Sequence, residues 1–142
     1  MFYEPKKGNP FKIDPFKSLV FPRPIGWISS ISKDGLSNLA PYSYFNAVAD
    51  EPPQIMFCSN GSSSHGKYKD SLSNILSTKE FVVNFVTSDF RNQMNISSKD
   101  FKPNEDEFIL SNLKKKKSKL VNAPSVKDSP VNLECKLVKT IK

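Results

Sequence analysis

The stretch between residues 61 and 71 has the composition of an anion-binding site. It combines glycines, serine hydroxyls and lysines with a helix that is predicted to begin at its end. The first N–H groups of a helix are unpaired and lie at the positive end of the helix dipole, so they favour phosphate and similar anions. On composition alone, a flexible loop before an ordinary capped helix explains the stretch better. The residues concerned are Gly61, Ser62, Ser63, Ser64, Gly66, Lys67 and Lys69, followed by Asp70 and Ser71.

Other kinds of chemistry find little support in the sequence. His65 is the only histidine, and it has no clustered carboxylates or cysteines near it, so it is predicted to be an exposed loop residue and not a metal ligand. The sequence has no Walker motif and no G-x-G-x-x-G segment. Cys58 and Cys135 form no C-x-x-C pair, and Asp106 and Glu107 are interpreted as loop charges. We therefore predict no metal site and no catalytic side chain.

A second polar segment follows the first predicted hairpin turn. Between residues 40 and 46, small and polar side chains alternate with aromatic ones, which is unusual for a strand of a purely structural core. Pro41 has no N–H group and cannot lie in a continuous central ladder, so it marks a bulge or a sheet edge. Backbone groups near Pro41 are therefore predicted to be free to bind something other than a neighbouring strand.

The composition is that of one globular domain. The 142 residues are 37% hydrophobic and 25% charged, which is enough to bury one core. The net charge of +7 comes almost entirely from lysine, since only Arg23 and Arg91 are arginines. Base recognition and bidentate phosphate contacts favour arginine, so the charge is interpreted as a solvated basic surface and not as a nucleic-acid interface.

The expected location follows from the absence of targeting signals. The sequence shows no secretory signal peptide and no apolar run of membrane-spanning length, which predicts a cytoplasmic protein without membrane association. In a reducing cytosol Cys58 and Cys135 are expected to be free, buried thiols, and a disulfide between them is the alternative.

The elements that position these groups are mostly strands. Residues 25–32 and 36–48 are predicted as two strands joined at Asp34-Gly35, a pair that favours a tight hairpin turn. In the first strand both faces carry apolar or small side chains, so each face is expected to be covered. Further strands are predicted at residues 54–58, 80–86 and 131–141, and helices from Asp70 onward and over residues 90–96.

The remaining segments are predicted to lack regular structure. Residues 1–20 form a polar, proline-broken lead whose aromatic side chains could pack on the outside of the domain, and residues 99–107 form a loop. The lysines of residues 114–117, with Lys119, are interpreted as a solvated charge run. The last strand is amphipathic, with Val131, Leu133, Cys135 and Leu137 inward. It needs a partner, which is an earlier strand, a second subunit or residues beyond Lys142.

Six segments occur along the chain in a recognisable order. They are PRPIGWISSISKDG-SNLAPYSYFNAVADEPP, KDSLSNI, KEFVVNFV, MNISS, DEF and SPVNLECKL, and they extend over about residues 21–137. Together they resemble the flavin reductase-like family of FMN-binding split barrels. The resemblance implies a mainly β fold with a few short helices, a Greek-key-like antiparallel barrel formed by residues 21–142 after a lead of residues 1–20. It also implies a homodimer with FMN near the dimer interface.

The resemblance assigns roles to residues of this chain. Backbone groups of the family's A-P-Y-S segment are expected at the polar edge of the flavin ring, with Asn46 adding a side-chain hydrogen bond. The family's K-D-T segment is expected to bind the phosphate. The corresponding residues here are Ala40, Pro41, Tyr42 and Ser43 for the ring, and Lys69, Asp70 and Ser71 for the phosphate. Trp27, Ile28, Ser29 and Ser30 are expected alongside the flavin, and Ser59 is counted among the cofactor-binding residues.

The leading hypothesis from this resemblance is an oxidoreductase that takes hydride from NAD(P)H onto FMN. Electrons would then pass to free flavin, to a small-molecule acceptor such as a quinone or to a protein partner. Family members normally continue past SPVNLECKL with strands that close the barrel, so C-terminal strands are expected to be missing here. Two alternatives follow: a flavin-carrying electron-transfer protein without its own nicotinamide site, and a truncated remnant that no longer binds cofactor.

Overall fold

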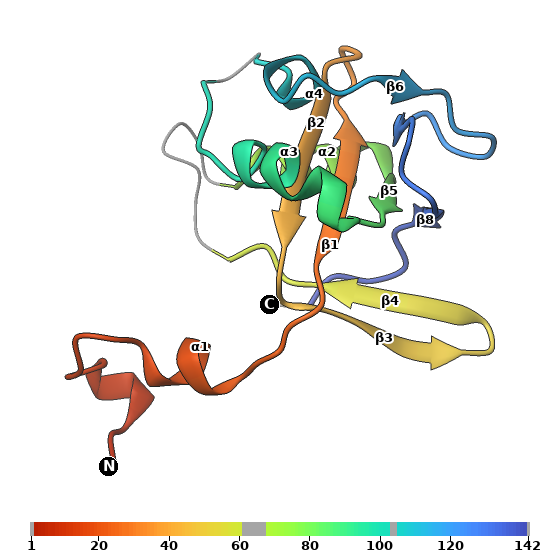
Figure 1. The fold of residues 1–142 in the computed structure, drawn as a ribbon. Coiled ribbons are helices and arrows are strands. Elements are labelled where there is room, and N and C mark those ends of the chain that lie inside the picture. Colours follow the sequence, from red (N-terminus) through yellow and green to blue (C-terminus); the bar gives the residue numbers. More distant parts are fainter. Residues whose placement is uncertain (1, 61–67, 103–104, 142) are drawn as a thin grey trace.

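A four-stranded antiparallel sheet forms the centre of the protein (Figure 1). The computed structural model describes residues 2–60, 68–102 and 105–141. The strand order is β2-β1-β5-β8, with β1 (Gly26–Ile31), β2 (Ser37–Tyr42), β5 (Glu80–Asn84) and β8 (Asn132–Lys136). β1 and β2 are joined through a turn at Gly35, whose φ of 85° suits glycine, as the sequence predicts. The predicted strand at residues 80–86 is confirmed as β5.

Strand β1 is covered on both faces, as its sequence predicts. Trp27 points to one face, where it packs with Leu39, Phe108 and Val126. Ile28 points to the other face, where it packs with Ile75 among other residues. Both side chains are fully buried, and burial of each stabilises the fold by roughly 1.5–3 kcal/mol. β1 is therefore the strand around which two hydrophobic layers form.

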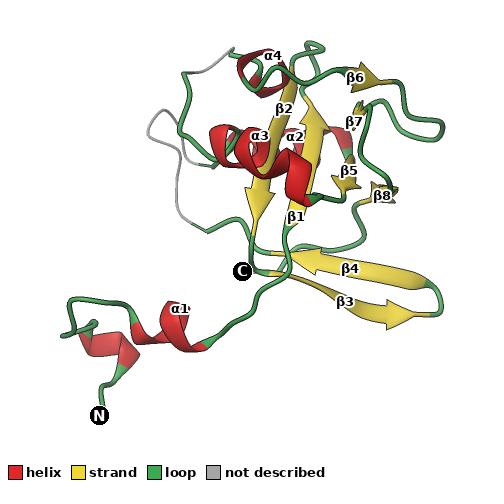
Figure 2. Cartoon of the chain, in the orientation of Figure 1, coloured by secondary structure: helices red, strands yellow, loops and turns green. Residues whose placement is uncertain are grey.

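Short helices cover the two faces of the sheet (Figure 2). α2 (Asp70–Thr78) places Ile75 on the face that carries Ile28, and it ends at Lys79, which has a positive φ of 64°. α3 (Arg91–Ile96), preceded by the 3-10 turn η2 (Ser88–Phe90), places Met94 on the face that carries Trp27. The predictions of a helix from Asp70 and of one over residues 90–96 are confirmed. α4 (Glu107–Leu110) was not predicted; it begins where the sequence was interpreted as loop.

The predicted strand at residues 36–48 is wrong as a single strand. The chain leaves the central sheet after Tyr42, and β3 (Phe45–Asp50) pairs with β4 (Pro53–Phe57) in a separate hairpin. In Figure 1 this hairpin projects from the lower side of the central sheet. The break between β2 and β3 depends on a glycine at position 26, because a Cβ added to Gly26 would lie 2.6 Å from the Phe45 ring. The Phe45 ring fills the space beside Gly26 and fixes the point at which the chain changes sheets.

The lead of residues 1–20 contains two short helices, so the prediction that it lacks regular structure is wrong. η1 (Pro5–Lys7) and α1 (Pro15–Leu19) both begin with proline, and Asp14 caps α1 by accepting hydrogen bonds from two backbone N–H groups. Phe16 contacts the ring of Tyr44 but remains 59% exposed. The aromatic side chains of this segment therefore cover little of the domain.

The C-terminal third adds a two-stranded ribbon and the last strand of the central sheet. β6 (Lys115–Lys116) and β7 (Ser125–Val126) pair with each other and were not predicted. The lysines around β6 are exposed, as expected for a solvated charge run. β8 is shorter than the predicted strand at residues 131–141, and its partner is an earlier strand, β5. Val131 is exposed instead of inward, while Leu133 and Cys135 are half-buried.

The fold is mainly β with a few short helices, in agreement with the predicted fold class. All strand pairs are antiparallel, and within the described residues the sheets do not close into a barrel. No helix in the described part of the chain is long and apolar enough to cross a membrane.

Candidate functional site

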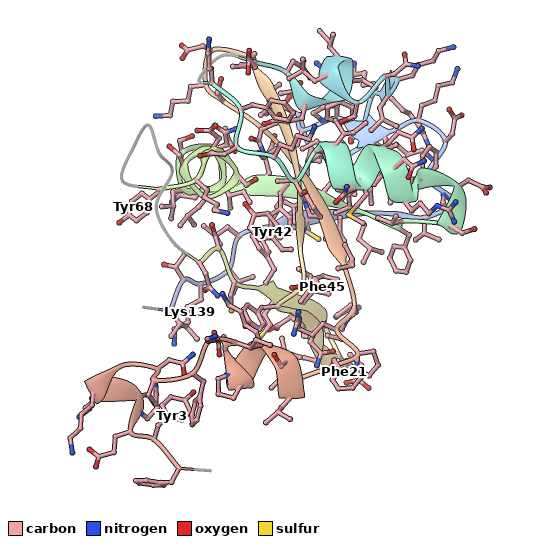
Figure 3. All side chains as sticks on the ribbon, turned by 60° about the vertical axis from the view of Figure 1, so that its left-hand side comes forward. Tyr3, Phe21, Tyr42, Phe45, Tyr68 and Lys139 are labelled. Carbon is pink, nitrogen blue, oxygen red and sulfur yellow. The ribbon has the colours of Figure 1, made fainter. Side chains whose placement is uncertain are left out.

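Three segments meet at the end of β2: residues 40–43, Ser59 after β4, and the first turn of α2. The phenol of Tyr42 lies beside the hydroxyl groups of Ser59 and Ser71 and brings these segments together. In the view of Figure 3, Tyr42 lies between Tyr68, which precedes α2, and Phe45, which begins the β3–β4 hairpin. The structure thus brings the predicted ring segment and the predicted phosphate segment to one place.

Pro41 lies on an edge of the sheet, which resolves the choice between a bulge and an edge. β2 is the outermost strand, and its pairing with β1 runs from Tyr42 to Ser37 without a register shift. The N–H of Leu39 points away from β1 and donates to Glu107 at 3.1 Å. Since backbone N–H directions repeat every second residue, the nitrogen of Pro41 faces the same open edge and needs no strand partner.

Arg23 fixes the end of β2. Its Nε donates to Ser43 Oγ at 3.2 Å, and its Nη1 donates to the carbonyl oxygens of Lys17 and Val20 at 2.7 Å each. The guanidinium also lies 5.5 Å from the ring centre of Tyr44. Because Ser43 Oγ accepts the bond from Arg23, its own hydroxyl hydrogen is directed elsewhere and is available to donate.

The N-terminus of α2 has the properties of an anion site. Lys69 occupies the N-cap position, and no described side chain caps the first turn. The N–H groups of the first turn and the exposed ammonium group of Lys69 supply positive charge at this end. Asp70 is the acidic residue of the first turn, and Ser71 is 1% exposed at its base.

Two hydroxyl groups beside this helix terminus are buried and have no hydrogen-bond partner of acceptable geometry among the described residues. They are Tyr42 Oη and Ser59 Oγ. Burial also raises the pKa of the Tyr42 phenol above its usual range, so the group is protonated and can donate. Buried polar groups without partners are rare in folded proteins, because each costs about 1–3 kcal/mol. Their position beside an uncapped helix terminus indicates a ligand-binding site.

A buried carboxylate lies next to the same terminus. Glu107 is 7% exposed and accepts the Leu39 N–H, and no cation pairs with it in the described part of the chain. Burial raises the pKa of Glu107 to about 7, and the negative charges of Asp70 and Asp106 add to the rise. The interpretation of Glu107 as a loop charge is wrong, because α4 directs its side chain into the protein.

Asn38 connects Glu107 to α2. One end of its side-chain amide lies 2.7 Å from Ser71 Oγ, and the other end lies 3.1 Å from Glu107 Oε1. Asn38 is itself 7% exposed, so the three side chains form a buried polar chain from α4 through β2 to α2. Neither Asn38 nor Glu107 was predicted as a site residue.

The other predicted site residues lie on β3 and inside β1. Asn46 is exposed on β3, where its side chain accepts the N–H of Ala47. The four residues predicted alongside the flavin are fully buried in β1, namely Trp27, Ile28, Ser29 and Ser30. Their polar groups have partners inside the protein: the Trp27 indole N–H donates to Ser97 and the Ser30 hydroxyl accepts from Asn74. The structure gives these side chains a core role and does not place them on the surface.

Two further sequence predictions concern the two cysteines and the glycine- and serine-rich loop. Both thiols are free, but the prediction that both are buried is wrong, because Cys58 is exposed on leaving β4. Cys135 is half-buried, and burial raises the pKa of its thiol to about 11. Residues 61–67, including His65, lie outside the described residues. Within the described ranges, no three histidine, cysteine, aspartate or glutamate side chains gather as in a metal site.

The chain was compared with families of known proteins. The model of the family described as "flavin reductase like domain" matches residues 17–142, which is most of the chain. The chain belongs to the flavin reductase-like family.

Relatives and solved structures agree with this membership. An uncharacterized protein of Aquifex aeolicus is 47% identical over 123 residues, which cover 87% of this chain and 62% of the relative. Nitrilotriacetate monooxygenase component B from Bacillus cereus is 31% identical with a TM-score of 0.80, covering 92% of this chain and 67% of that one. A protein from Shewanella frigidimarina, described as a "putative flavin reductase with split barrel domain", has a TM-score of 0.75 at 22% identity, covering 82% of this chain and 56% of that one. The fold is thus that of the split-barrel flavin reductases.

The chain spans about three fifths of the length of the curated relative. The candidate site residues that the sequence did not predict are Arg23, Asn38 and Glu107. A signal for α4 was present, because Asp106 is a good N-cap and is followed by the apolar Phe108 and Ile109. No sequence signal indicates that Asn38 and Glu107 would meet, since 68 residues separate Glu107 from the neighbouring Leu39.

Proposed function

We propose that this chain binds FMN, with the phosphate at the N-terminus of α2 and the flavin ring along the end of β2. The observation that carries the proposal is the pair of buried, unpartnered hydroxyls of Tyr42 and Ser59 beside an uncapped helix terminus. An anionic group with several acceptor oxygens is the kind of ligand that such donors fit. Membership in the flavin reductase-like family supports FMN as that ligand.

The residues around the site suit the two ends of this cofactor. Lys69, the first-turn N–H groups of α2 and the hydroxyl of Ser71 would hold the phosphate. The open edge of β2 at Ala40 and Pro41, with the hydroxyl of Ser43, would offer hydrogen bonds to the polar edge of the ring. Asn46 remains a proposed ring contact from the hairpin. When bound, the flavin supplies hydride acceptance and one-electron transfer, while the protein binds and orients it.

We further propose that the protein is an oxidoreductase that uses NAD(P)H to reduce the bound flavin, and that a small-molecule acceptor or free flavin takes the electrons. The names of the two similar structures, a monooxygenase component and a flavin reductase, support this reaction class. On this proposal residues 21–142 are the FMN-binding domain, residues 1–20 are a lead segment, and the protein acts in the cytoplasm. No nucleic acid or membrane takes part.

A homodimer is part of the proposal. The β3–β4 hairpin exposes Val48 (52%) and Met56 (50%), and Ile25 beside it is 37% exposed. Apolar side chains gathered on one projecting hairpin favour burial against a second copy. Sedimentation of the wild type and of a Val48→Ser variant tests this: a dimer that dissociates more readily in the variant is expected, and a monomeric wild type would rule the dimer out.

The absorbance spectrum of the purified protein tests cofactor binding. We expect the bands of oxidised flavin, either as isolated or after addition of FMN and removal of the excess. A colourless protein that fails to bind added FMN would overturn both the reductase and the electron-carrier hypotheses and leave the remnant that no longer binds cofactor.

Anaerobic addition of NADH or NADPH then separates the two flavin hypotheses. Bleaching of the flavin bands at a rate that depends on nucleotide concentration is expected for the reductase. A flavin that stays oxidised with both nucleotides, but is bleached by dithionite, would instead indicate an electron carrier without its own nicotinamide site.

A further inference from the structure

Asn38 lies between a titratable group and the proposed phosphate site. One end of its amide lies 2.7 Å from Ser71 Oγ in α2, and the other lies 3.1 Å from Glu107 Oε1 in α4. All three side chains are at least nine-tenths buried. A side-chain amide has a donor end and an acceptor end, so the state of one neighbour determines which end faces the other.

The two orientations of this amide correspond to two protonation states of Glu107. When Glu107 is ionised, it accepts only, so Asn38 Nδ2 faces the carboxylate and Asn38 Oδ1 accepts the hydrogen of the Ser71 hydroxyl. When Glu107 is protonated, its O–H donates to Asn38 Oδ1, and Nδ2 donates to Ser71 Oγ. Only in the second state is the hydroxyl hydrogen of Ser71 free to donate to a ligand.

We propose that Asn38 relays the protonation state of Glu107 to Ser71, so that an anion binding at the N-terminus of α2 is coupled to the uptake of one proton by Glu107. The inference rests on the proposed function, in which the anion is the phosphate of FMN. The balance is simple: one proton passes from solvent to the carboxylate, the carboxylate becomes a carboxylic acid, and no covalent bond to the ligand forms. Glu107 and Asn38 are positioning residues that act through Ser71.

The charges around Glu107 favour this coupling. Asp70 faces it from α2, Asp106 from its own helix and the phenol of Tyr42 from β2. Lys115 of β6 pairs with Asp106. Glu107 itself has no cationic partner among the described residues, so a phosphate anion nearby further disfavours its ionised form. The pKa of Glu107 lies at about 7 before any ligand binds. A bound anion can therefore change the fraction of Glu107 that is protonated near neutral pH.

Binding of FMN and of riboflavin, measured between pH 5.5 and 8.5, tests the relay. For the wild type, the dissociation constant of FMN is expected to rise above pH 7 by up to about tenfold per pH unit, the limit for one coupled proton. Glu107→Gln resembles the protonated state, since its amide can donate to Asn38, and it should bind FMN without this rise. Riboflavin lacks the phosphate and should show no difference between the two proteins.

Two further variants separate the relay from a direct effect of the Glu107 charge on the bound phosphate. Asp106→Asn changes the neighbouring carboxylate outside the relay and should keep the pH dependence, with a slightly lower midpoint. Asn38→Ala should lose most of the pH dependence although Glu107 remains, and only the smaller part due to charge repulsion between Glu107 and the phosphate should persist. A pH dependence in Asn38→Ala equal to that of the wild type would show that the charge acts through space and would overturn the relay.

Calorimetry of the wild type keeps the test independent of variant folding. At pH 8 free FMN is already the dianion, since the second phosphate pKa is about 6. Uptake of a substantial fraction of a proton on binding FMN but not riboflavin, compared in two buffers, is the expected result. Equal proton uptake for both ligands would contradict the relay and leave FMN binding intact, whereas no binding of FMN by any protein would remove the proposed function together with the relay.

Discussion

Two clusters of buried polar side chains, one around Asn84 and one around Tyr42, lie on opposite faces of the central sheet and differ in how far their hydrogen bonds are satisfied. On the face that carries Trp27, Asn84 is fully buried and makes four hydrogen bonds, to Trp27, Ser29, Val126 and Asn132. On the opposite face, Tyr42 Oη and Ser59 Oγ are buried without a partner among the described residues. Glu107 lies in the same region with a raised pKa.

This difference separates structure from binding. The groups around Asn84 satisfy one another, so they lower the free energy of the fold and have nothing left to offer a ligand. The groups around Tyr42 leave donors unsatisfied and a carboxylate unpaired, which destabilises the fold. Such a cost persists where a ligand supplies the missing partners, so the difference indicates a structural role for the cluster around Asn84 and a binding role for the cluster around Tyr42.

The largest effect on stability is expected in the cluster around Asn84, whose hydrogen bonds are satisfied. Asn84→Ala would leave the Val126 N–H without its partner in the core and would remove the bonds of the Asn84 side chain to Ser29 and Asn132. We expect the free energy of unfolding to fall by about 3–4 kcal/mol, as measured by urea denaturation. The dissociation constant of FMN should change little in the folded fraction. A loss of FMN affinity without a loss of stability would contradict the structural role assigned to Asn84.

The next effect concerns Glu107 and depends on pH. Its raised pKa means that the native state holds this proton more tightly than the unfolded chain does. The stabilisation is therefore fully present below the unfolded value near 4.5 and is lost as the pH rises through about 7. The quantity of interest is the free energy of unfolding of Glu107→Gln minus that of the wild type. We expect this difference to be roughly 3 kcal/mol larger at pH 8 than at pH 4.5. Thermal denaturation at the two pH values measures this.

A matched control for that experiment is Glu134→Gln. Glu134 accepts the N–H groups of Lys119 and Leu120, which lower the pKa of its carboxyl. The stability that Glu134 contributes therefore has the opposite pH dependence to that of Glu107, and it should be lost as the pH falls. A wild-type stability that does not decline between pH 5 and 8 relative to Glu107→Gln would contradict the burial of an unpaired carboxylate.

The third effect concerns the helix terminus. Lys69→Ala removes the exposed ammonium group at the N-terminus of α2 and should weaken FMN binding by about tenfold, as measured by fluorescence titration. Riboflavin binding should not change. The control is Lys79→Ala at the other end of α2, which should leave FMN affinity unaltered. An unchanged affinity in Lys69→Ala would remove the phosphate assignment at this residue.

The smallest effect sharpens the comparison most. Tyr42→Phe removes one unpartnered buried hydroxyl, so stability should stay constant or rise by about 1 kcal/mol. FMN affinity should fall by about fivefold, because one donor to the ligand is lost. A destabilised Tyr42→Phe variant would show that the hydroxyl is satisfied within the protein, and would place it with Asn84 in the structural class.

Local patterns in the sequence predicted most of the fold. Alternation placed β1, and helical spacing after Asp70 placed α2. Both of these signals depend on side chains within a few residues of each other. The failures lie where a distant contact decides the local structure: Phe45 beside Gly26 divides a predicted single strand, and the packing of Phe108 with Trp27 stabilises α4, which is only four residues long.

The sequence by itself determined the chemical inventory of this protein: a polar segment over residues 40–46, a helix beginning at Asp70, and membership in a flavin reductase-like family. Tertiary structure alone decided that Tyr42, Ser59 and Ser71 meet, and that Glu107 is buried behind them. The physical reason is that composition fixes which donors and charges exist, whereas their pKa values and unpaired hydrogen bonds depend on neighbours that are far apart in the chain.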